Sequence, residues 1–233
     1  MTLGTGRIEK QIIHAGIQGA GCSIPADVEG GDFFDFIPLG GERLIAAIGD
    51  VMGKGSTAAR QMKDLRVTLR TCAGNNMPLL AIMEQINEMG GRQLRLAGSF
   101  ATLCLISYET RNACLTSLCA GHPAPLVFNG SKVHVLKVRG AALGLLEGYQ
   151  GTGPDAVCLA PGDVILLYTD GLVEARNGQG ETYGLRRLEE ITSANSCHNA
   201  TELRETILND LFTFTGCRQQ RDDVTLVVLK TGR

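Results

Sequence analysis

Short apolar runs bounded by glycines dominate the first fifty residues, and this pattern predicts β-strands. One strand is expected over residues 7–18, and a second, rich in Phe, over residues 32–39. A third is expected over residues 42–48, ending at Gly49-Asp50. The pair Gly40-Gly41 predicts the turn between the second and third strands. The chain is therefore expected to begin with strands and not with helices.

After Gly55 the apolar residues recur every three or four positions, which is typical of amphipathic helices. The stripe of the first predicted helix consists of Ala58, Met62, Leu65, Leu69 and Cys72. We expect Ser56 or Thr57 to cap this helix. A second helix is expected after Pro78, because proline suits the first turn of a helix. Its stripe consists of Leu79, Ile82, Ile86 and Met89.

Strand patterns return after the two helices. Five more strands are predicted, at residues 99–108, 112–119, 126–129, 132–138 and 164–169. Two helices should follow, with stripes at Leu185, Leu188 and Ile191 and then at Leu203, Ile207, Leu211 and Phe214. A closing strand is expected over residues 224–229. Because strands and helices come in groups and do not alternate as βαβ units, this order predicts an α+β layered sandwich of antiparallel sheets with helices outside them.

Composition narrows the class of protein. A chain of 233 residues that is 44% hydrophobic can bury its own core, so we expect a single domain spanning residues 1–233. The formal net charge of −2 argues against nucleic acid as a partner. The chain has no apolar run of about 18 residues and no apolar signal segment. We therefore expect a cytoplasmic protein, monomeric and without a membrane partner. The eight cysteines contain no Cys-x-x-Cys pair, so reduced thiols are expected in place of a zinc site or disulfides.

Four aspartates adjoin apolar strands: Asp32 in GGDFFDF, Asp50 in AIGDVMGKG, Asp170 in LLYTDGLVEA and Asp222 in RDDVTLVVL. A single aspartate at a strand end is an ordinary turn residue. Two carboxylates about 4 Å apart repel by about 4 kcal/mol at an effective dielectric constant of about 20. Several of them gathered together therefore require a cation or a raised pKa. Oxygen ligands without histidine select hard cations, so the set predicts Mg²⁺ or Mn²⁺.

Two of these aspartates have a carboxylate neighbour. Asp222 is followed by Asp223, and Asp32 is followed three residues later by Asp35. In a regular strand these spacings put the members of each pair on opposite faces, so only one of each pair is expected to face the site. The spacing does not decide which one.

Six segments, taken in order, resemble those of a known family: GGDFFDF, IGDVMGKG, FATLCLISYE, AGHPAPL, YTDGLVEARN and DDVTLVVL. They resemble the bacterial metal-dependent protein phosphatases (PPM) of the SpoIIE and RsbU type, relatives of eukaryotic protein phosphatase type 2C. The resemblance runs over about residues 20–229. It implies a four-layer αββα sandwich, with two antiparallel sheets between helix pairs and metal ions at one edge. It also implies a serine/threonine phosphatase in which a hydroxide bridging two metal ions attacks phosphorus without a covalent intermediate.

The resemblance also implies ligands for two Mn²⁺ or Mg²⁺ ions. Asp50 corresponds to the carboxylate that bridges both ions. The backbone carbonyl of Val51 and the side chain of Asp32 belong to the second ion, and Asp170 and Asp222 hold the first. These aspartates are the expected catalytic residues.

Further charged residues receive roles from the same resemblance. Asp35 and Asp223 become orienting or surface carboxylates. Glu174, four residues after Asp170, matches the position where relatives offer a carboxylate to a weaker third ion. The arginine that grips the phosphate in the animal enzymes has no match here. Lys54 is a candidate for that task, with a solvated loop lysine as the alternative.

Four other residues allow two interpretations each. His122, between Gly and Pro in AGHPAP, is expected to be a locally packed turn residue, with an acid–base role as the alternative. Lys63, Arg66 and Arg70 would form a basic face on the first helix. We expect this face to be solvated, and docking of a partner is the alternative.

The resembling enzymes act on phosphoserine or phosphothreonine of regulatory proteins in bacterial stress and sporulation signalling. The expected partners are therefore phosphorylated stressosome scaffold proteins or anti-sigma antagonists. Only about 20 residues precede the first motif, too few for a sensor domain, which resembles the stressosome feedback phosphatases of the RsbX type. Two alternatives are an inactive phosphatase-like module that binds phosphoproteins and a two-metal phosphodiesterase. The latter would bring histidine ligands or a basic groove, and four scattered histidines with a net charge of −2 supply neither.

Overall fold

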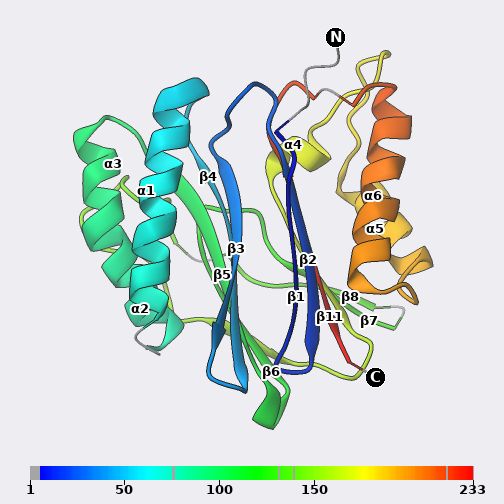
Figure 1. The fold of residues 1–233 in the computed structure, drawn as a ribbon, viewed down its shortest axis with the longest axis horizontal. Coiled ribbons are helices and arrows are strands. Elements are labelled where there is room, and N and C mark those ends of the chain that lie inside the picture. Colours follow the sequence, from blue (N-terminus) through cyan, green and yellow to red (C-terminus); the bar gives the residue numbers. More distant parts are fainter. Residues whose placement is uncertain (1–5, 75–76, 131, 139, 219, 233) are drawn as a thin grey trace.

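Two antiparallel β-sheets lie face to face between two layers of helices (Figure 1). The computed structural model describes residues 6–74, 77–130, 132–138, 140–218 and 220–232. In the first sheet the strand order is β1 (Ile8–His14), β2 (Ile17–Ile24), β11 (Val224–Thr231), β10 (Val164–Tyr168), β7 (Leu126–Asn129) and β8 (Lys132–Val135). In the second sheet it is β3 (Asp32–Leu39), β4 (Arg43–Val51), β5 (Ala101–Glu109), β6 (Cys114–Ala120) and β9 (Asp155–Cys158).

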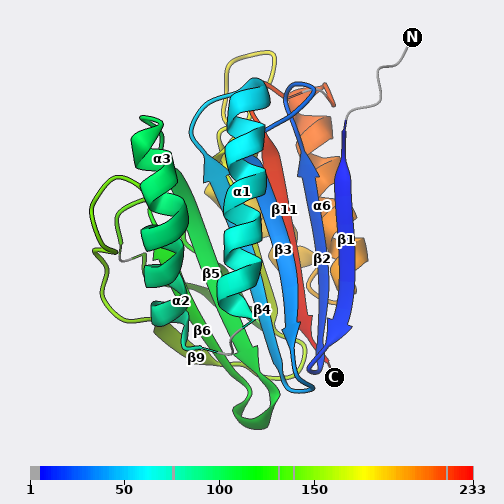
Figure 2. The ribbon, with the colours of Figure 1, turned by 60° about the vertical axis from the view of Figure 1, so that its left-hand side comes forward.

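Helices cover the outer face of each sheet. The second sheet is covered by α1 (Gly55–Ala73) and by a continuous run of α2 (Leu79–Ile86), the π-helical turn η1 (Asn87–Gly91) and α3 (Arg92–Leu96), which lie side by side in Figure 2. The first sheet is covered by α5 (Leu185–Ala194) and α6 (Ala200–Thr215). The remaining short helices are η2 (Thr110–Asn112) and α4 (Asp170–Val173). None of the described helices is long and apolar enough to cross a membrane.

Alternation along the strands divides the apolar core into three layers. In β4, Ile45 and Ala47 pack toward α1 and α2, whereas Ala46 and Ile48 pack into the layer between the sheets. A third cluster lies between the first sheet and helices α5 and α6. Because successive side chains of a strand point to opposite faces, each sheet can contact a helix layer and the other sheet at once. The four-layer αββα sandwich implied by the resemblance is thus confirmed.

The single strand expected over residues 7–18 is wrong. The chain reverses there and forms the hairpin of β1 and β2, in which His14 pairs with Ile17. The two turn residues, Ala15 and Gly16, have φ angles of 53° and 73°. This left-handed pair matches the twist of a two-residue hairpin. Alanine rarely adopts this conformation, so a turn at Ala15 was not expected from the residues.

The boundaries of other predicted elements also shift. Helix α1 begins at Gly55 with Lys54 as its N-cap, and no side chain caps it, so the expected cap at Ser56 or Thr57 is wrong. Strand β4 runs through the expected stop at Gly49-Asp50 and ends at Val51. Strand β9 and helix α4 were not predicted, because their residues show no clear period.

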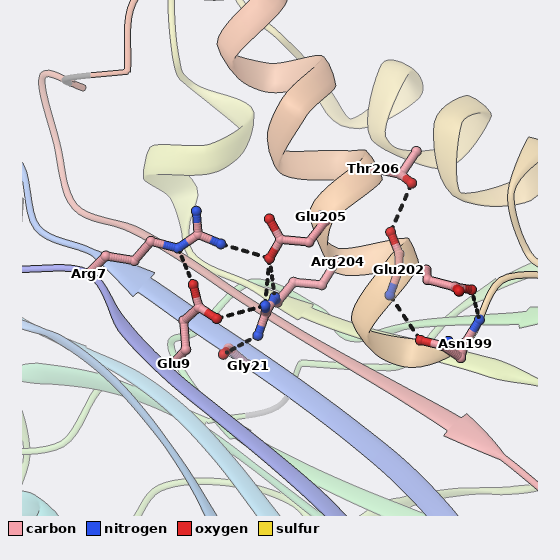
Figure 3. A network of polar contacts seen from close by, with 8 residues as sticks. All are labelled: Arg7, Glu9, Gly21, Asn199, Glu202, Arg204, Glu205 and Thr206. Carbon is pink, nitrogen blue, oxygen red and sulfur yellow. Dashed lines mark hydrogen bonds and ion pairs between the residues drawn. The ribbon is translucent and has the colours of Figure 1, made fainter.

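A buried arginine joins α6 to the first sheet (Figure 3). Arg204 donates a hydrogen bond to the carbonyl of Gly21 at 3.1 Å and forms ion pairs with Glu9 and Glu205. Arg7 meets the same two carboxylates. Because every charge in this group has an opposite partner, the guanidinium of Arg204 can be buried without an unpaired donor.

A second charged cluster lies between β3 and α1. The buried carboxylate of Asp35 accepts hydrogen bonds from Lys10 at 2.8 Å, from Arg66 at 3.0 Å and from Arg70 at 2.5 and 2.6 Å. The expectation that Asp35 lies at the surface is therefore wrong. Arg66 and Arg70 remain 29% and 51% exposed, as a solvated face requires, while their guanidinium groups neutralise the buried carboxylate. Lys63 remains outside this cluster, exposed and paired with Glu29.

Replacement of Asp35 by Asn should lower the free energy of unfolding by about 2 kcal/mol near neutral pH, since hydrogen bonds to a charged group are lost. Burial alone would raise the pKa of Asp35, but hydrogen bonds from Arg70, Arg66 and Lys10 lower it below its usual range. A depressed pKa stabilises the fold above the unfolded value of about 3.9 and ceases to do so as the pH falls. The difference in the free energy of unfolding between Asp35→Asn and wild type should therefore become smaller below about pH 4.

Urea unfolding at pH 7 and pH 3 measures both effects. Asp64→Asn is the matched control, because Asp64 is an exposed aspartate on α1. Equal stability of Asp35→Asn and wild type at pH 7 would show that the cluster contributes nothing to the fold.

Candidate metal centre

Strand pairing brings two of the expected ligands together at one edge of the second sheet. Asp32, the first residue of β3, pairs with Asp50 of β4, and Asp50 pairs with Thr102 of β5. Side chains that pair directly across neighbouring strands lie on the same face, with Cβ atoms about 5 Å apart. The register therefore decides that Asp32 and Asp50 are neighbours.

The first sheet supplies the other two expected aspartates. Asp170 opens helix α4, two residues after the end of β10, and Asp222 lies two residues before the start of β11. These strands pair antiparallel, with Tyr168 opposite Leu226, so the end of one meets the beginning of the other. All four aspartates consequently reach the same edge of the sandwich.

The aspartates line one cavity of about 310 Å³, which we call the aspartate cavity. Its lining residues are Asp32, Asp50, Met52, Gly53, Lys54, Phe100, Thr102, Asp170, Asp222 and Asp223. A larger cavity of about 710 Å³ lies at the opposite end of β3 and β4, around the Gly40-Gly41 turn, and none of these aspartates lines it. The expected catalytic residues are thus gathered at a single place.

Burial and neighbouring negative charges raise the pKa values of two carboxylates in this cavity. Burial, followed by the charge of Asp170, raises the pKa of Asp50 to about 6. Burial and the charge of Asp50 raise the pKa of Asp32 well above its usual range. A hydrogen bond from the hydroxyl of Thr169 to Asp32, at 2.8 Å, holds this buried carboxylate in place. Such a site favours any cation that offsets the negative charge.

Asp223 corrects the expectation that only one member of the Asp222-Asp223 pair faces the site. Both line the aspartate cavity, because both precede the first residue of β11 and strand alternation does not apply to them. The carboxylate of Asp223 accepts hydrogen bonds from the backbone N–H groups of Ala26 and Gly31, each at 2.8 Å. Asp223 therefore orients the loop that leads into Asp32, as the resemblance implied.

Glycines allow the backbone to approach this loop closely. A Cβ atom on Gly30 would lie 2.0 Å from a carboxylate oxygen of Asp223, and one on Gly31 would lie 2.3 Å from the carbonyl oxygen of Val51. The N–H of Val51 in turn donates to the carbonyl of Gly31 at 3.2 Å. Any larger residue would displace the carboxylate or the carbonyl, and Val51 is the expected backbone ligand.

Glu174 lies outside the aspartate cavity. It is exposed, follows α4, and lines a neighbouring groove of about 450 Å³ together with Asp222. Its N–H donates to the carbonyl of Asp170 at 2.8 Å, so a single helical turn separates the two acidic residues. The structure thus places Glu174 beside the other carboxylates, across Asp222 from them.

His122 is buried, with 2% of its surface exposed, and not merely a turn residue. It lines a cavity of about 320 Å³ that shares Asp50, Asp170 and Thr102 with the aspartate cavity. A hydrogen bond of 2.8 Å joins its Nδ1 to the hydroxyl of Thr102. Burial lowers the pKa of His122 to about 3, which keeps the ring neutral. Sequence reasoning missed Thr102, which only its pairing with Asp50 in the sheet could have indicated.

The donor set of the aspartate cavity fits a hard divalent cation in its chemistry. Carboxylate oxygens and one nearby carbonyl are the ligands that Mg²⁺ and Mn²⁺ prefer. The ammonium group of Lys54 lies 3.0 Å from Asp222, so one of these carboxylates is already paired with a cation. Within the described residues, however, no three carboxylate, imidazole or thiol groups converge closely enough to hold an ion together. The aspartates share a cavity without yet meeting at one point.

A four-layer αββα sandwich is the fold of the type 2C protein phosphatases, and solved structures confirm this fold. The PP2C domain of SiaA from Pseudomonas aeruginosa superposes with a TM-score of 0.77 at 24% identity, covering 98% of this chain and 87% of that one. The RsbU and RsbW domains of Rv1364c from Mycobacterium tuberculosis superpose with a TM-score of 0.76 at 28% identity, covering 94% of this chain and 61% of that one.

The family follows from the sequence match. The family model described as stage II sporulation protein E (SpoIIE) matches residues 40–232, and the chain therefore belongs to this family. Protein IcfG of Synechocystis sp. is 30% identical over 88% of this chain, and phosphoserine phosphatase RsbU of Bacillus subtilis is 27% identical over 89%. The chain spans 36% and 61% of the lengths of these two relatives. The expected family, of the SpoIIE and RsbU type, is thus confirmed.

Proposed function

We propose that residues 1–233 form a single phosphatase domain that hydrolyses phosphoserine and phosphothreonine with the aid of two Mn²⁺ or Mg²⁺ ions. The observation that carries this proposal is the gathering of Asp32, Asp50, Asp170 and Asp222 around one cavity at the edge of both sheets. At the same edge the pKa of Asp50 is raised, so a cation would relieve the cost of its ionised form. The glycines there let backbone atoms approach the carboxylates closely.

Each residue of the site has a defined task in this proposal. Asp50 would contribute its carboxylate to both ions, Asp32 and the carbonyl of Val51 would hold one of them, and Asp170 and Asp222 would hold the other. The ions would neutralise charge on the phosphoryl oxygens and lower the pKa of attacking water. On the protein side, Thr169 fixes the carboxylate of Asp32 through its hydroxyl.

Two neighbouring carboxylates would assist the metal ligands. Asp223 keeps the loop before Asp32 in place through its bonds to backbone N–H groups. Glu174, in the adjoining groove, would serve a weaker third ion together with Asp222.

The proposed substrates are phosphorylated regulatory proteins of bacterial stress signalling, of the stressosome scaffold or anti-sigma antagonist type. The named activity of the relative RsbU, a phosphoserine phosphatase, supports phosphoserine as the residue acted on. The chain would act on them in the cytoplasm as a monomer, and neither nucleic acid nor a membrane is needed as a partner.

Hydrolysis of three substrates in the presence of Mn²⁺ tests this function against its alternatives. We expect turnover of para-nitrophenyl phosphate and of a phosphoserine protein, and none of bis(para-nitrophenyl) phosphate. Cleavage of the diester would instead indicate a phosphodiesterase. Binding of the phosphoprotein without hydrolysis of any substrate would indicate an inactive phosphatase-like module.

A further inference from the structure

Lys54 brings a positive charge to the aspartate cavity. Of the described residues that line this cavity, five are aspartates and Lys54 alone is basic. Its ammonium group lies 3.0 Å from Oδ1 of Asp222 and donates a hydrogen bond to the carbonyl of Arg221 at 3.0 Å. The loop lysine considered from the sequence is solvated, with 63% of its side chain exposed, and its charged end lies at the cavity.

The backbone around Lys54 is shaped by two glycines. Gly53 and Gly55 have φ angles of 107° and 74°, a region that residues with a Cβ rarely adopt. Space does not require glycine at either position, since a Cβ on Gly53 would meet only Ala58, at 3.9 Å, and one on Gly55 would meet nothing within 4 Å. The two glycines are therefore needed for their positive φ angles. The backbone that they allow holds Lys54 in an extended conformation as the N-cap residue of α1.

Stability does not account for the ion pair between Lys54 and Asp222. The two side chains are 63% and 60% exposed. Ion pairs that are so exposed contribute little to the stability of the fold, because water solvates and screens both charges. The ammonium can therefore leave Asp222 at little cost and remain within the cavity on its flexible stem.

The charge of the cavity indicates what the ammonium is for. With every carboxylate ionised, the five aspartates carry five negative charges, and two divalent ions would supply four positive ones. A phosphoryl dianion would still meet a negative cavity without Lys54. A lysine ammonium is a compact cation with three donors that suits phosphate oxygens.

We propose that Lys54 is a phosphate-binding residue, which donates hydrogen bonds to the phosphoryl oxygens of the phosphomonoester in the aspartate cavity. This inference rests on the proposed phosphatase function and adds to it the group that holds the substrate's phosphate. It assigns to a lysine at the start of α1 the task for which the sequence shows no matching arginine.

Calorimetric titration of inorganic phosphate into the Mn²⁺-loaded protein tests the proposal directly. Lys54→Met should weaken phosphate binding about 10-fold or more, because a hydrogen bond to a charged group is lost. In assays with para-nitrophenyl phosphate, the inhibition constant of phosphate and the KM should rise together. Lys54→Arg keeps the charge and should recover part of the affinity. Lys63→Met is the matched control, since Lys63 is also 63% exposed and in an exposed ion pair, and it should bind phosphate as wild type does.

Two results would overturn the role of Lys54. One is unchanged phosphate affinity in Lys54→Met, which with tighter Mn²⁺ binding would make Lys54 only a counter-ion of Asp222. The other is an equal loss of phosphate affinity in Lys63→Met, which would make the effect one of overall charge. Failure of the proposed function is a separate result. In that case the wild-type chain hydrolyses no phosphomonoester with Mn²⁺, whereas the phosphate titration still reports on Lys54.

Discussion

Addition of a chelator should abolish hydrolysis of para-nitrophenyl phosphate, and Mn²⁺ or Mg²⁺ should restore it. The reason lies in the aspartate cavity, where five carboxylates face a single lysine and no other basic residue of the described lining. Such a cavity repels a phosphate dianion until cations offset its charge. A side-chain nucleophile could act without metal, but the sequence has no G-x-S-x-G or C-x₅-R segment that would supply one.

A stability measurement separates loss of metal from loss of fold. Mn²⁺ that binds only the native state should raise the midpoint of thermal unfolding, with a gain of about 2.7 kcal/mol at a free concentration of 100 times the Kd. The chelated protein should therefore unfold at a lower temperature but still cooperatively. Full activity in a preparation shown by elemental analysis to be free of metal would contradict the proposed mechanism.

Replacement of Asp50 by Asn should reduce turnover by at least about 10²-fold. Asp50 occupies the centre of the site: it pairs with Asp32 on one side and with Thr102 on the other, and it lines both adjoining cavities. The amide of Asn keeps the shape but removes the charge that would bridge two cations. Burial, followed by the charge of Asp170, raises the pKa of Asp50 to about 6, so its ionised form is disfavoured and Asp50→Asn should leave the fold at least as stable in the absence of metal.

Turnover and calorimetric Mn²⁺ titration should be measured together on Asp50→Asn and two comparison variants. Asp64→Asn removes an exposed carboxylate of α1 away from the aspartate cavity and should behave as wild type. The turnover and Mn²⁺ affinity of Asp223→Asn should lie between those of the other two variants. This substitution loosens the loop before Asp32 without removing an expected ligand. Equal losses in Asp50→Asn and Asp223→Asn would refute the distinction between ligand and orienting residue.

The candidate site was largely predictable because its aspartates stand in recognisable segments. Each of the four expected ligands adjoins an apolar strand, and all four line one cavity. The incorrect expectation for Asp223 has a physical reason. Asp223 was expected to turn away because strand alternation was applied to it, but it lies in the loop before β11, where backbone N–H groups from residues 26–32 decide its direction.

The periodicity of apolar residues was sufficient to predict most of the helices and strands. The stripes of α1, α5 and α6 and the strands β3 and β10 depend on neighbours within a few residues, which the sequence displays directly. The turn at Ala15 and Gly16 escaped this reasoning, because the twist of the paired strands imposes a conformation that alanine does not signal.

Only the tertiary structure decided which charged groups meet. The sequence shows Arg66 and Arg70 as a basic helix face, and only the structure shows that both guanidinium groups pair with Asp35, more than 30 residues away. In the same way, the register of β3, β4 and β5 places Asp32, Asp50 and Thr102 side by side. Sequence periodicity fixes which face of an element is apolar, whereas the partner of a buried charge depends on strand register and layer packing, which join residues that are far apart in the chain.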